Sequence, residues 1–380
     1  MDFDPQSLGR LGVSEEQVEF MDIAERFCRD HTSIAAVREM MSDDFGLGLD
    51  GSAYNEMAYM GWFGITIPED YGGVGLSLAE AVPIAEQIGR RLMMVPFIPI
   101  TVAAQAILAG GTETQKKHYL PKIIEEGGAS LALSEVNGSF DLADIATTAS
   151  LGKQGYKLSG TKILVENLDS AEFLVLSAVV DGAVRLFVFE TSLIPEAAMR
   201  RETLIDETKR SYTLTLDGII LPGTAIMDEA KTAATLQRID LAANLLGSAE
   251  QIGAAQSCIA YTVDYLQTRK QFGKPIGSYQ ALKHTIVDAY VGYEKGRSLL
   301  YAAAHNFEDQ GKGEIATRMA AVGAGRALSF AADRAIQFHG GFGFTYDCDA
   351  QLYRRRAIFH DSLFGNIRWH KKKLAGLLFN

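Results

Sequence analysis

A basic corner at residues 268–284 is the strongest sign of chemistry in this sequence. The stretch TRKQFGKPIGSYQALKH places Arg269, Lys270, Lys274 and Lys283 around a glycine-proline turn between two helix-like segments. An arginine guanidinium is a planar, permanently charged fork that suits a phosphate or a carboxylate. The same side chains would also suit a solvated helix end, where basic groups offset the helix dipole. The stretch therefore predicts either an anion site or an ordinary C-terminal turn.

Composition narrows the choice of anion. The chain has 380 residues, a formal net charge of −11 and 47% hydrophobic residues, which is typical of a globular protein with more than one domain. Nucleic acid would require a broad basic face, and one short basic run cannot supply it. A small anionic ligand is therefore the expected partner, and nucleic acid is not.

Cysteine usage and hydropathy indicate the compartment. Cys28, Cys258 and Cys348 are scattered and lack the spacing of metal ligands, so we expect reduced thiols and no metal site. The first residues show no basic start followed by an apolar run, and no stretch of about 18 apolar residues is free of charge. We expect a cytoplasmic protein that does not enter a membrane.

Three regions of different pattern must position the basic corner. Residues 1–126 read as helices, with a turn at 68–75 (PEDYGGVG) and a helix end predicted at LPK, 120–122. Residues 127–232 contain short alternating runs such as YKLSGTKILVE, AEFLVLSAVV, VRLFVFET and YTLTLDGIIL, which predict a β domain. Residues 233–380 are again helical and rich in alanine, which favours a helix bundle. The prediction is an α+β protein of three domains.

Five stretches, in the same order, resemble the acyl-CoA dehydrogenases, flavoproteins that desaturate acyl-CoA thioesters. The resemblance covers nearly the whole length and implies an N-terminal α-helical domain, a middle β-barrel or sandwich domain and a C-terminal four-helix bundle. It also implies FAD as cofactor, an acyl-CoA substrate and an electron acceptor flavoprotein. The stretches are IPEDYGGVG (67–75), GTETQKKHYLPKI (111–123), LALSEVNGSFD (131–141), TRKQFGKPIGSYQALKH and IQFHGGFGF (336–344).

The resemblance also implies a set of cofactor-binding residues. Arg269, in the R-x-x-F-G motif, would reach the FAD pyrophosphate, and the two glycines of the GG motif would let the backbone approach the adenosine half closely. His339 beside them is expected to be packed or solvent-facing. The implied cofactor contacts are Arg269, Gln271, Phe272, Gln280, Gln337, Gly340, Gly341 and Ser134.

The chain departs from the family at the catalytic base. Flavin desaturation needs a base that removes the proton α to the thioester carbonyl. The family's glutamate positions carry Phe364 and Ala243 here, and neither side chain can take a proton. Asp361 and Asp240 lie one helical turn away and could replace the base, although surface or capping roles suit both.

The segments that face the flavin in the family also differ in this chain. The family's K-M-W-I-T-N segment, whose Trp packs on the flavin and whose Thr bonds N5, reads K-I-L-V-E-N at 162–167, without the aromatic ring or the hydroxyl. Glu166 near N5 would oppose the negative charge of the reduced flavin. In the loop 134–141, Ser134 can still donate a hydrogen bond, but the proline and the glycine-serine register of the family are disturbed.

These departures favour one of three hypotheses. In the family's tetramers one subunit surrounds the flavin ring, while a neighbour contributes the arginine, glutamine and Gly-Gly contacts. The chain resembles the second set better and is similar to the small subunits of bacterial heterotetrameric dehydrogenases of the pimeloyl-CoA or steroid side-chain type. The first hypothesis is therefore a subunit that completes a paralogous partner's site. The others are a homotetramer that uses Asp361 as base, and a scaffold without catalytic activity.

Overall fold

The computed structural model describes residues 15–42 and 51–379. The chain divides into two compact units. Of the described residues, the helical unit comprises 15–42, 78–93 and 244–379, and the mixed unit comprises 51–77 and 94–243. The parts of the predicted N-terminal domain at 1–14 and 43–50 lie outside the described residues. The predicted boundaries of three domains, at 126 and 232, stay a prediction.

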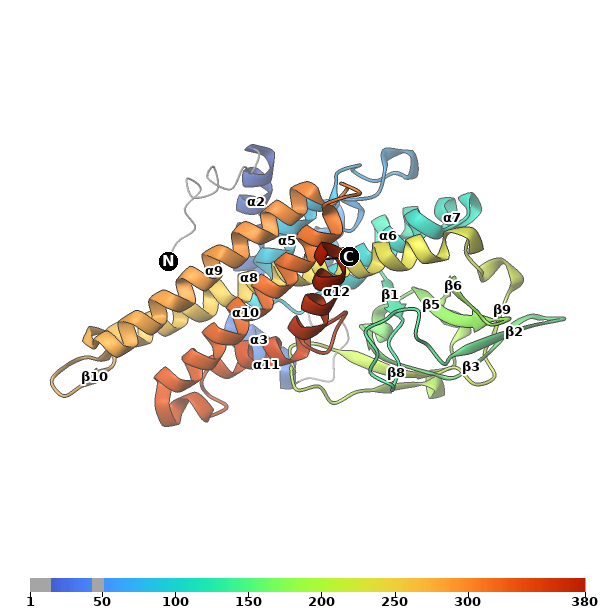
Figure 1. Cartoon of the computed structure of the whole chain (residues 1–380). Helices are drawn as coiled ribbons and strands as arrows, with labels where there is room; N and C mark the ends of the chain where they lie inside the picture. The colour runs from blue at the N-terminus through green and yellow to red at the C-terminus, as the bar shows by residue number, and fades with distance from the viewer. Residues whose placement is uncertain (1–14, 43–50, 380) are drawn as a thin grey trace. The chain divides into compact units, whose positions relative to one another are not determined.

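The helical unit is built on long helices that are rich in alanine. Helices α9 and α10 run side by side over most of their length (Figure 1). Their facing positions carry small residues such as Gly296 and Gly323, which let the two backbones approach closely. The helices of this unit are α2 (Glu15–His31), α3 (Ile34–Ser42), α5 (Leu78–Arg91), the second part of α8 (Thr232–Thr268), α9 (Gln280–Asn306), α10 (Gly313–His339), α11 (Ala350–His360) and α12 (Ile367–Phe379).

Helices α5 and α8 cross at backbone contact within the helical unit. A Cβ on Gly89 would lie 2.0 Å from the carbonyl oxygen of Glu250, and a Cβ on Gly253 would lie 1.8 Å from that of Glu86. Only glycine fits either position. The Glu86 carboxylate accepts hydrogen bonds from Arg297 at 3.0 Å and Tyr301 at 2.6 Å in the buried core. These contacts fix α5 against α8 and α9.

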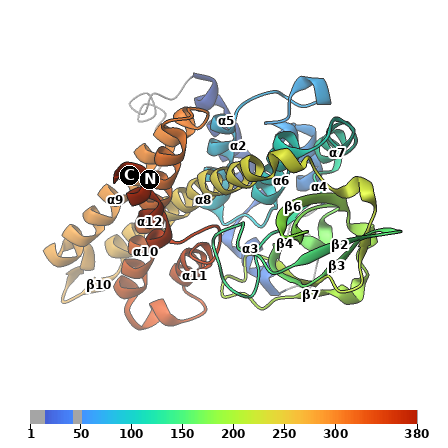
Figure 2. The same cartoon turned by 45° about the vertical axis from the view of Figure 1, so that its right-hand side comes forward.

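The mixed unit begins with helices that cover one edge of its strands (Figure 2). They are α4 (Gly51–Tyr59), α6 (Phe97–Gly110), α7 (Glu113–Glu126) and the first part of α8. Helix α6 is almost entirely buried and contacts strands β1 and β5. Short 3₁₀ turns are η2 (Trp62–Gly64), η3 (Glu69–Tyr71), η4 (Leu168–Ser170), η5 (Thr191–Leu193), η6 (Glu196–Ala198), η7 (Gly223–Ala225) and η8 (Glu229–Lys231).

The predicted helix end at LPK, 120–122, is wrong. Helix α7 starts with a capping box at Thr112 and continues through Pro121 to Glu126. Gly127, at φ 76°, ends the helix, and its N–H bonds the carbonyl oxygen of Ile123 at 2.9 Å. Leu120 and Ile123, on either side of the proline, are fully buried. Burial of this face outweighs the cost of a proline inside the helix.

Two sheets share the core of the mixed unit, as the sandwich prediction requires. The four predicted alternating runs all form strands, whereas β1, β2 and β7 lie outside those runs. Buried side chains of both sheets, such as Leu176 and Leu214, belong to one hydrophobic cluster. One sheet contains β1 (Ala129–Ala132), β5 (Phe173–Val180), β2 (Thr148–Gly152), β3 (Gly155–Ser159) and β9 (Ile220–Leu221), with β6 (Ala183–Glu190) beside β5; the other contains β4 (Thr161–Glu166), β8 (Ser211–Thr215) and β7 (Met199–Arg201).

The structure also bears on the predicted compartment and on metals. Within residues 15–42 and 51–379, no helix combines the length and the apolar character that a membrane span needs. All three cysteines are buried and free. In the same described residues, no cluster of three or more His, Cys, Asp or Glu side chains could hold a metal ion.

Candidate functional site

A small hairpin carries the predicted pyrophosphate anchor. After α8 ends at Thr268, strands β10 (Lys270–Gln271) and β11 (Lys274–Pro275) pair antiparallel, followed by η9 (Ile276–Ser278). The two residues at the tip, Phe272 and Gly273, have φ values of 53° and 81°. A two-residue hairpin favours positive φ at both positions, but phenylalanine adopts it only with strain. The Phe272 ring is 92% exposed, so nothing in the chain itself explains why it is held there.

Arg269 is exposed at the base of this hairpin. Its backbone is fixed by hydrogen bonds to Tyr265 and Ile276, at 2.9 Å each. Its guanidinium makes no hydrogen bond or ion pair with any residue that the structure describes. Gln271 and Gln280 are exposed too. The hairpin therefore presents an ordered backbone and an uncommitted cation, which fits an anchor for a phosphate.

The loop after α10 carries the other predicted anchor. Gln337 is exposed on the last turn of α10, and η10 (Gly340–Phe344) follows. His339 is packed, as expected: it is 3% exposed and lies against the rings of Tyr261 and Tyr265, with centroids 4.9 and 4.1 Å away. Burial lowers the pKa of His339, so the neutral form is favoured. The histidine acts as core packing below the loop.

The glycines of this loop separate into structural and open positions. Gly340 has a φ of 62°, which glycine adopts without strain. Packing within the chain requires glycine at position 343, because a Cβ there would lie 2.3 Å from the carbonyl oxygen of Ile336. Gly341 has neither a positive φ nor any atom within 4 Å of an added Cβ. Its open face fits a molecule from outside the chain, so the residues of the loop fit the adenosine end of FAD.

In the mixed unit, the loop that contains Ser134 is held by a buried ion pair. The Lys162 ammonium donates to the Glu135 carboxylate at 2.7 Å and to Ser177 at 3.0 Å. Glu135 also accepts hydrogen bonds from the backbone N–H groups of Ala146 and Thr147. Burial alone would raise the pKa of Glu135, but these hydrogen bonds outweigh it and hold that pKa below its usual range. The pair fixes both ends of the loop to β4.

Strand β4 is irregular where the family places its flavin contacts. Leu164 has a φ of 53°, within a break in the pairing between β4 and β8. Its N–H lies 3.3 Å from the Glu202 carboxylate, which also accepts a hydrogen bond from Thr213. Glu166 forms an ion pair with Lys209 at 3.9 Å. The negative charge expected beside the flavin is thus balanced by a lysine, which the sequence alone did not reveal.

The first predicted base position follows α11 in the helical unit. Phe364 is half-buried with a φ of 46°, and its carbonyl oxygen accepts a hydrogen bond from Asn244 at 3.1 Å. Asp361 is exposed just after α11, and its side chain makes no hydrogen bond and no close ion pair among the described residues. Desolvation raises the pKa of Asp361, against the opposing effects of His360 and Arg354. A carboxylate with a raised pKa is a stronger base.

The second predicted base position lies on the part of α8 in the mixed unit. Ala243 is 3% exposed and is part of the core. Asp240, one turn earlier, is half-buried and already engaged in an interaction. Asp240 is therefore a poorer replacement base than Asp361.

Most of the non-glycine residues with a positive φ lie in segments of the resemblance. Among the described residues, six non-glycine residues have a positive φ, and four of them lie in motifs of the resemblance. Such conformations cost about 1–3 kcal/mol each and persist where the surrounding structure enforces them. Strain of this kind gathers at ligand sites. The four residues are Leu164, Asn167, Phe272 and Phe364.

Comparisons with known proteins agree with this geometry. The model of the acyl-CoA dehydrogenase N-terminal domain matches residues 14–127, and that of the C-terminal domain matches residues 230–375. The fold is similar to that of the glutaryl-coenzyme A dehydrogenase complex with glutaryl-CoA, with a TM-score of 0.86 and 24% identity over 99% of this chain and 96% of that chain. The predicted fold class is confirmed.

Two further relatives are similar over nearly their whole length. Acyl-CoA dehydrogenase IpdE2 of Mycolicibacterium smegmatis is 30% identical over 97% of this chain and 100% of its own. A solved variant of the Tcur3481–Tcur3483 steroid ACAD has a TM-score of 0.84 and 28% identity, over 97% of this chain and 98% of that chain. The chain therefore belongs to the acyl-CoA dehydrogenase family, FAD-containing oxidoreductases that act on CH–CH bonds.

Proposed function

We propose that this chain is the cofactor-anchoring subunit of a heterotetrameric acyl-CoA dehydrogenase whose paralogous partner carries the catalytic base. The observation that carries the proposal is a contrast within one chain. Arg269 is exposed and uncommitted, whereas the two base positions hold Phe364 and Ala243. A subunit with its own complete site would need both the cofactor anchor and the base. A subunit that only completes a partner's site needs the anchor alone.

The roles of the anchoring residues follow from their positions. Arg269 would hold the pyrophosphate, and Gln271, Phe272 and Gln280 would lie along the cofactor. Gln337, Gly340 and Gly341 would meet the adenosine half, where the open face at Gly341 admits close approach. FAD, when bound, accepts the β-hydride of the thioester. The α-proton would go to a carboxylate of the partner, because neither Phe364 nor Ala243 can accept it.

The remaining residues at the predicted flavin site stabilise the mixed unit more than they suit catalysis. Ser134 is half-buried, and its carbonyl oxygen accepts a hydrogen bond from Ile163 at 2.9 Å. Leu164 cannot stack on a flavin ring or bond N5, and the charges of Lys162 and Glu166 are each engaged within the unit. The mixed unit thus keeps the backbone of a flavin site without the side chains that would act on the flavin.

The relatives indicate a substrate class. The name Tcur3481–Tcur3483 carries two designations, and that protein is described as a steroid ACAD. By this likeness we infer an enzyme of steroid breakdown. Its electrons would pass to an acceptor flavoprotein.

The test is to place Arg269→Ala in this chain within the purified assembly. Charged hydrogen bonds of this kind contribute about 1.5–3 kcal/mol, so FAD affinity should fall by about 10- to 100-fold. The matched control is Arg368→Ala, an exposed arginine on α12. Flavin content is read from absorbance after gel filtration. Equal flavin content in the two variants would contradict the anchoring role.

A self-sufficient homotetramer that uses Asp361 as base is the second candidate. The raised pKa of Asp361 favours this candidate, as does the absence of a hydrogen bond or close ion pair to its side chain among the described residues. The candidate requires the chain alone to reduce an acceptor with an acyl-CoA, and Asp361→Asn to abolish this activity. Activity that persists in Asp361→Asn would exclude it.

A further inference from the structure

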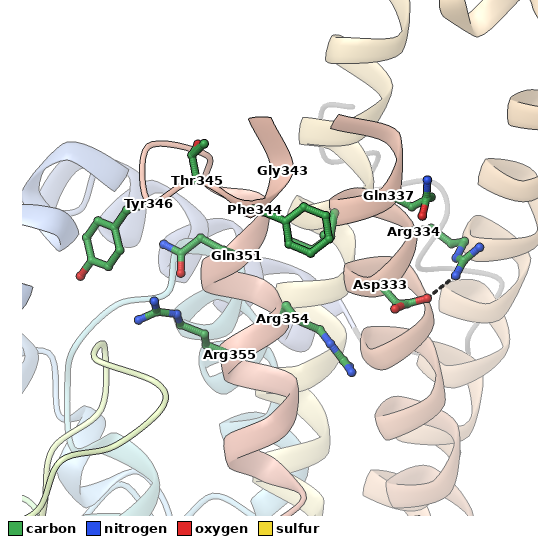
Figure 3. Close-up of a pocket in the computed structure, with 11 residues that line it drawn as sticks. Asp333, Arg334, Gln337, Gly343, Phe344, Thr345, Tyr346, Gln351, Arg354 and Arg355 are labelled. Atoms are coloured by element: carbon green, nitrogen blue, oxygen red, sulfur yellow. Dashed lines mark hydrogen bonds and ion pairs between the residues drawn. The ribbon is translucent and has the colours of Figure 1, made fainter. Parts of the chain in front are cut away.

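A connecting segment, residues 345–349, joins the Gly-Gly loop to α11 (Figure 3). Thr345 and Tyr346 lie on this segment, close to the end of α10 and the start of α11. In the proposed function, the Gly-Gly loop just before it meets the adenosine half of FAD. Surface loops open locally at little cost unless other elements hold them. What holds the segment therefore bears on how well the loop binds the cofactor.

Arg38, on α3 and distant in the sequence, holds the segment at two points. Its Nε and Nη2 atoms donate to one oxygen of the Asp349 carboxylate, at 3.0 and 2.7 Å. Its Nη1 atom donates to the carbonyl oxygen of Tyr346 at 2.7 Å. One planar guanidinium thus fixes both ends of the segment. A lysine ammonium lacks this planar fork and could not reproduce all three hydrogen bonds.

Asp349 binds Arg38 in place of a more usual role. It is the N-cap residue of α11, where an aspartate carboxylate commonly accepts a hydrogen bond from a backbone N–H two or three positions later. The Asp349 side chain makes no such bond within the described chain, and its carboxylate binds Arg38 instead. The contact with α3 therefore determines where α11 starts and where the segment before it lies.

Two further contacts support the same segment. The Tyr346 ring has two guanidiniums near it, with the Cζ atoms of Arg38 and Arg355 at 6.0 and 5.2 Å from its centroid. From α8, the Tyr261 hydroxyl accepts the N–H of Asp349 at 3.4 Å. The segment is thus held from α3, α8 and α11, and Arg38 alone supplies three hydrogen bonds to it.

The exposure of the pair indicates a local role. The side chains of Arg38 and Asp349 are 25% and 24% exposed, so water can take over their hydrogen bonds when the contact is lost. Ion pairs near the surface contribute little to the free energy of unfolding. Loss of Arg38 should therefore change the order of residues 345–349 much more than the stability of the whole unit.

We propose that Arg38 is a positioning residue for the cofactor. It acts on FAD binding through residues 345–349, which it holds so that the Gly-Gly loop and the start of α11 keep one arrangement. The inference rests on the proposed function, in which this loop anchors FAD. It adds a residue from the N-terminal helices to a site otherwise built at the ends of α8 and α10.

The first arm measures hydrogen exchange of the chain alone, in peptides that cover residues 342–352. Arg38→Gln should speed exchange there by about 10-fold or more, and Arg38→Lys should fall between this variant and the unchanged chain. The matched control is Arg26→Gln, which breaks an exposed ion pair with Asp22 on α2. Denaturant unfolding should be nearly the same for all of them. Unchanged exchange in Arg38→Gln would overturn the inference.

The second arm titrates the flavin-free assembly with FAD and follows flavin fluorescence. Arg38→Gln should weaken FAD binding by about 3- to 30-fold relative to Arg26→Gln, and Arg38→Lys should recover part of the loss. If Arg38→Gln binds FAD as tightly as the control while Arg269→Ala binds it more weakly, the inference is wrong and the proposed function stands. If neither variant changes the affinity for FAD, both are wrong.

Discussion

In the hairpin after α8 the guanidinium of Arg269 is exposed and has no partner in the described chain, whereas in β4 the ammonium of Lys162 is fully buried against Glu135. The hairpin and the loop at Gly340 and Gly341 offer polar groups and open space. The β4 region keeps equally strained backbone, but its charges are satisfied within the mixed unit.

The contrast between Arg269 and Lys162 distinguishes two roles that a charged residue in a motif can have. A charge that is satisfied internally stabilises the chain that carries it, and its loss is felt in the free energy of unfolding. A charge that is exposed and uncommitted contributes little to folding, so its place in a motif of the resemblance favours a role toward a ligand or a partner. By this criterion, we propose that the chain keeps one half of a flavin site for binding and the other half for structure.

The largest expected effect is in β4. Lys162→Met would leave the Glu135 carboxylate buried with only its backbone hydrogen bonds, and breaking such a pair costs about 3–5 kcal/mol. Denaturant unfolding should show a loss of about 3 kcal/mol. The control is Lys153→Met, an exposed lysine in the same unit. A loss no larger than that of the control would mean that the pair is not structural.

A pH effect tests a buried polar group close to the Phe364 position. Burial lowers the pKa of His370 to about 4, and its Nε2 lies 3.1 Å from the carbonyl oxygen of Gly365. In the unfolded chain the pKa is about 6.5, so the unfolded state binds more protons between pH 6.5 and 4. The free energy of unfolding should therefore fall by about 3 kcal/mol as the pH is lowered from 6.5 to 4. His370→Gln should flatten the dependence, and the exposed His284→Gln should not.

Two glycines of the loop after α10 allow a matched pair of substitutions. Gly343→Ala would place a methyl group 2.3 Å from the carbonyl oxygen of Ile336, so we expect a loss of about 2 kcal/mol in the free energy of unfolding. Gly341→Ala meets no atom within 4 Å and should change stability by less than about 0.5 kcal/mol. It should nevertheless lower the flavin content of the assembly. Equal stability losses would break the distinction between the two positions.

The smallest effect on stability is expected at the hairpin tip. Phe272 is 92% exposed with a strained φ, so Phe272→Gly should be neutral or slightly stabilising by about 0.5 kcal/mol. The flavin content of an assembly that carries Phe272→Gly should fall if the ring lies along the cofactor. A clear destabilisation in unfolding experiments would show that the ring packs within its own chain.

Much of the fold could be predicted because local pattern and burial agree. The alternating runs of β5 and β6 pair over eight residues each, and the buried side chains of α9, such as Ala289 and Tyr293, recur at the helical period. Pro121 misled because local propensity predicts a helix end there, while burial of Leu120 and Ile123 keeps the helix intact. Tertiary packing outweighs local propensity there, and the residues next to the proline in the sequence do not reveal that packing.

The candidate site could be predicted only in part. Motifs gave Arg269 and the Gly-Gly loop, but pairing between distant residues could not be read from them. Glu166 meets Lys209 through the pairing of β4 with β8, and Arg38 reaches Asp349 from a helix 311 positions away in the sequence. Neither Arg38 nor Asp349 belongs to a motif of the resemblance.

Flavin stoichiometry and native mass test the central claim most directly. The chain should be expressed alone and then together with candidate paralogous subunits, with FAD measured per chain in each purified species. We predict little or no FAD in the chain alone and about one FAD per pair of unlike subunits in a heterotetramer. One FAD per chain in an active homotetramer would contradict the account.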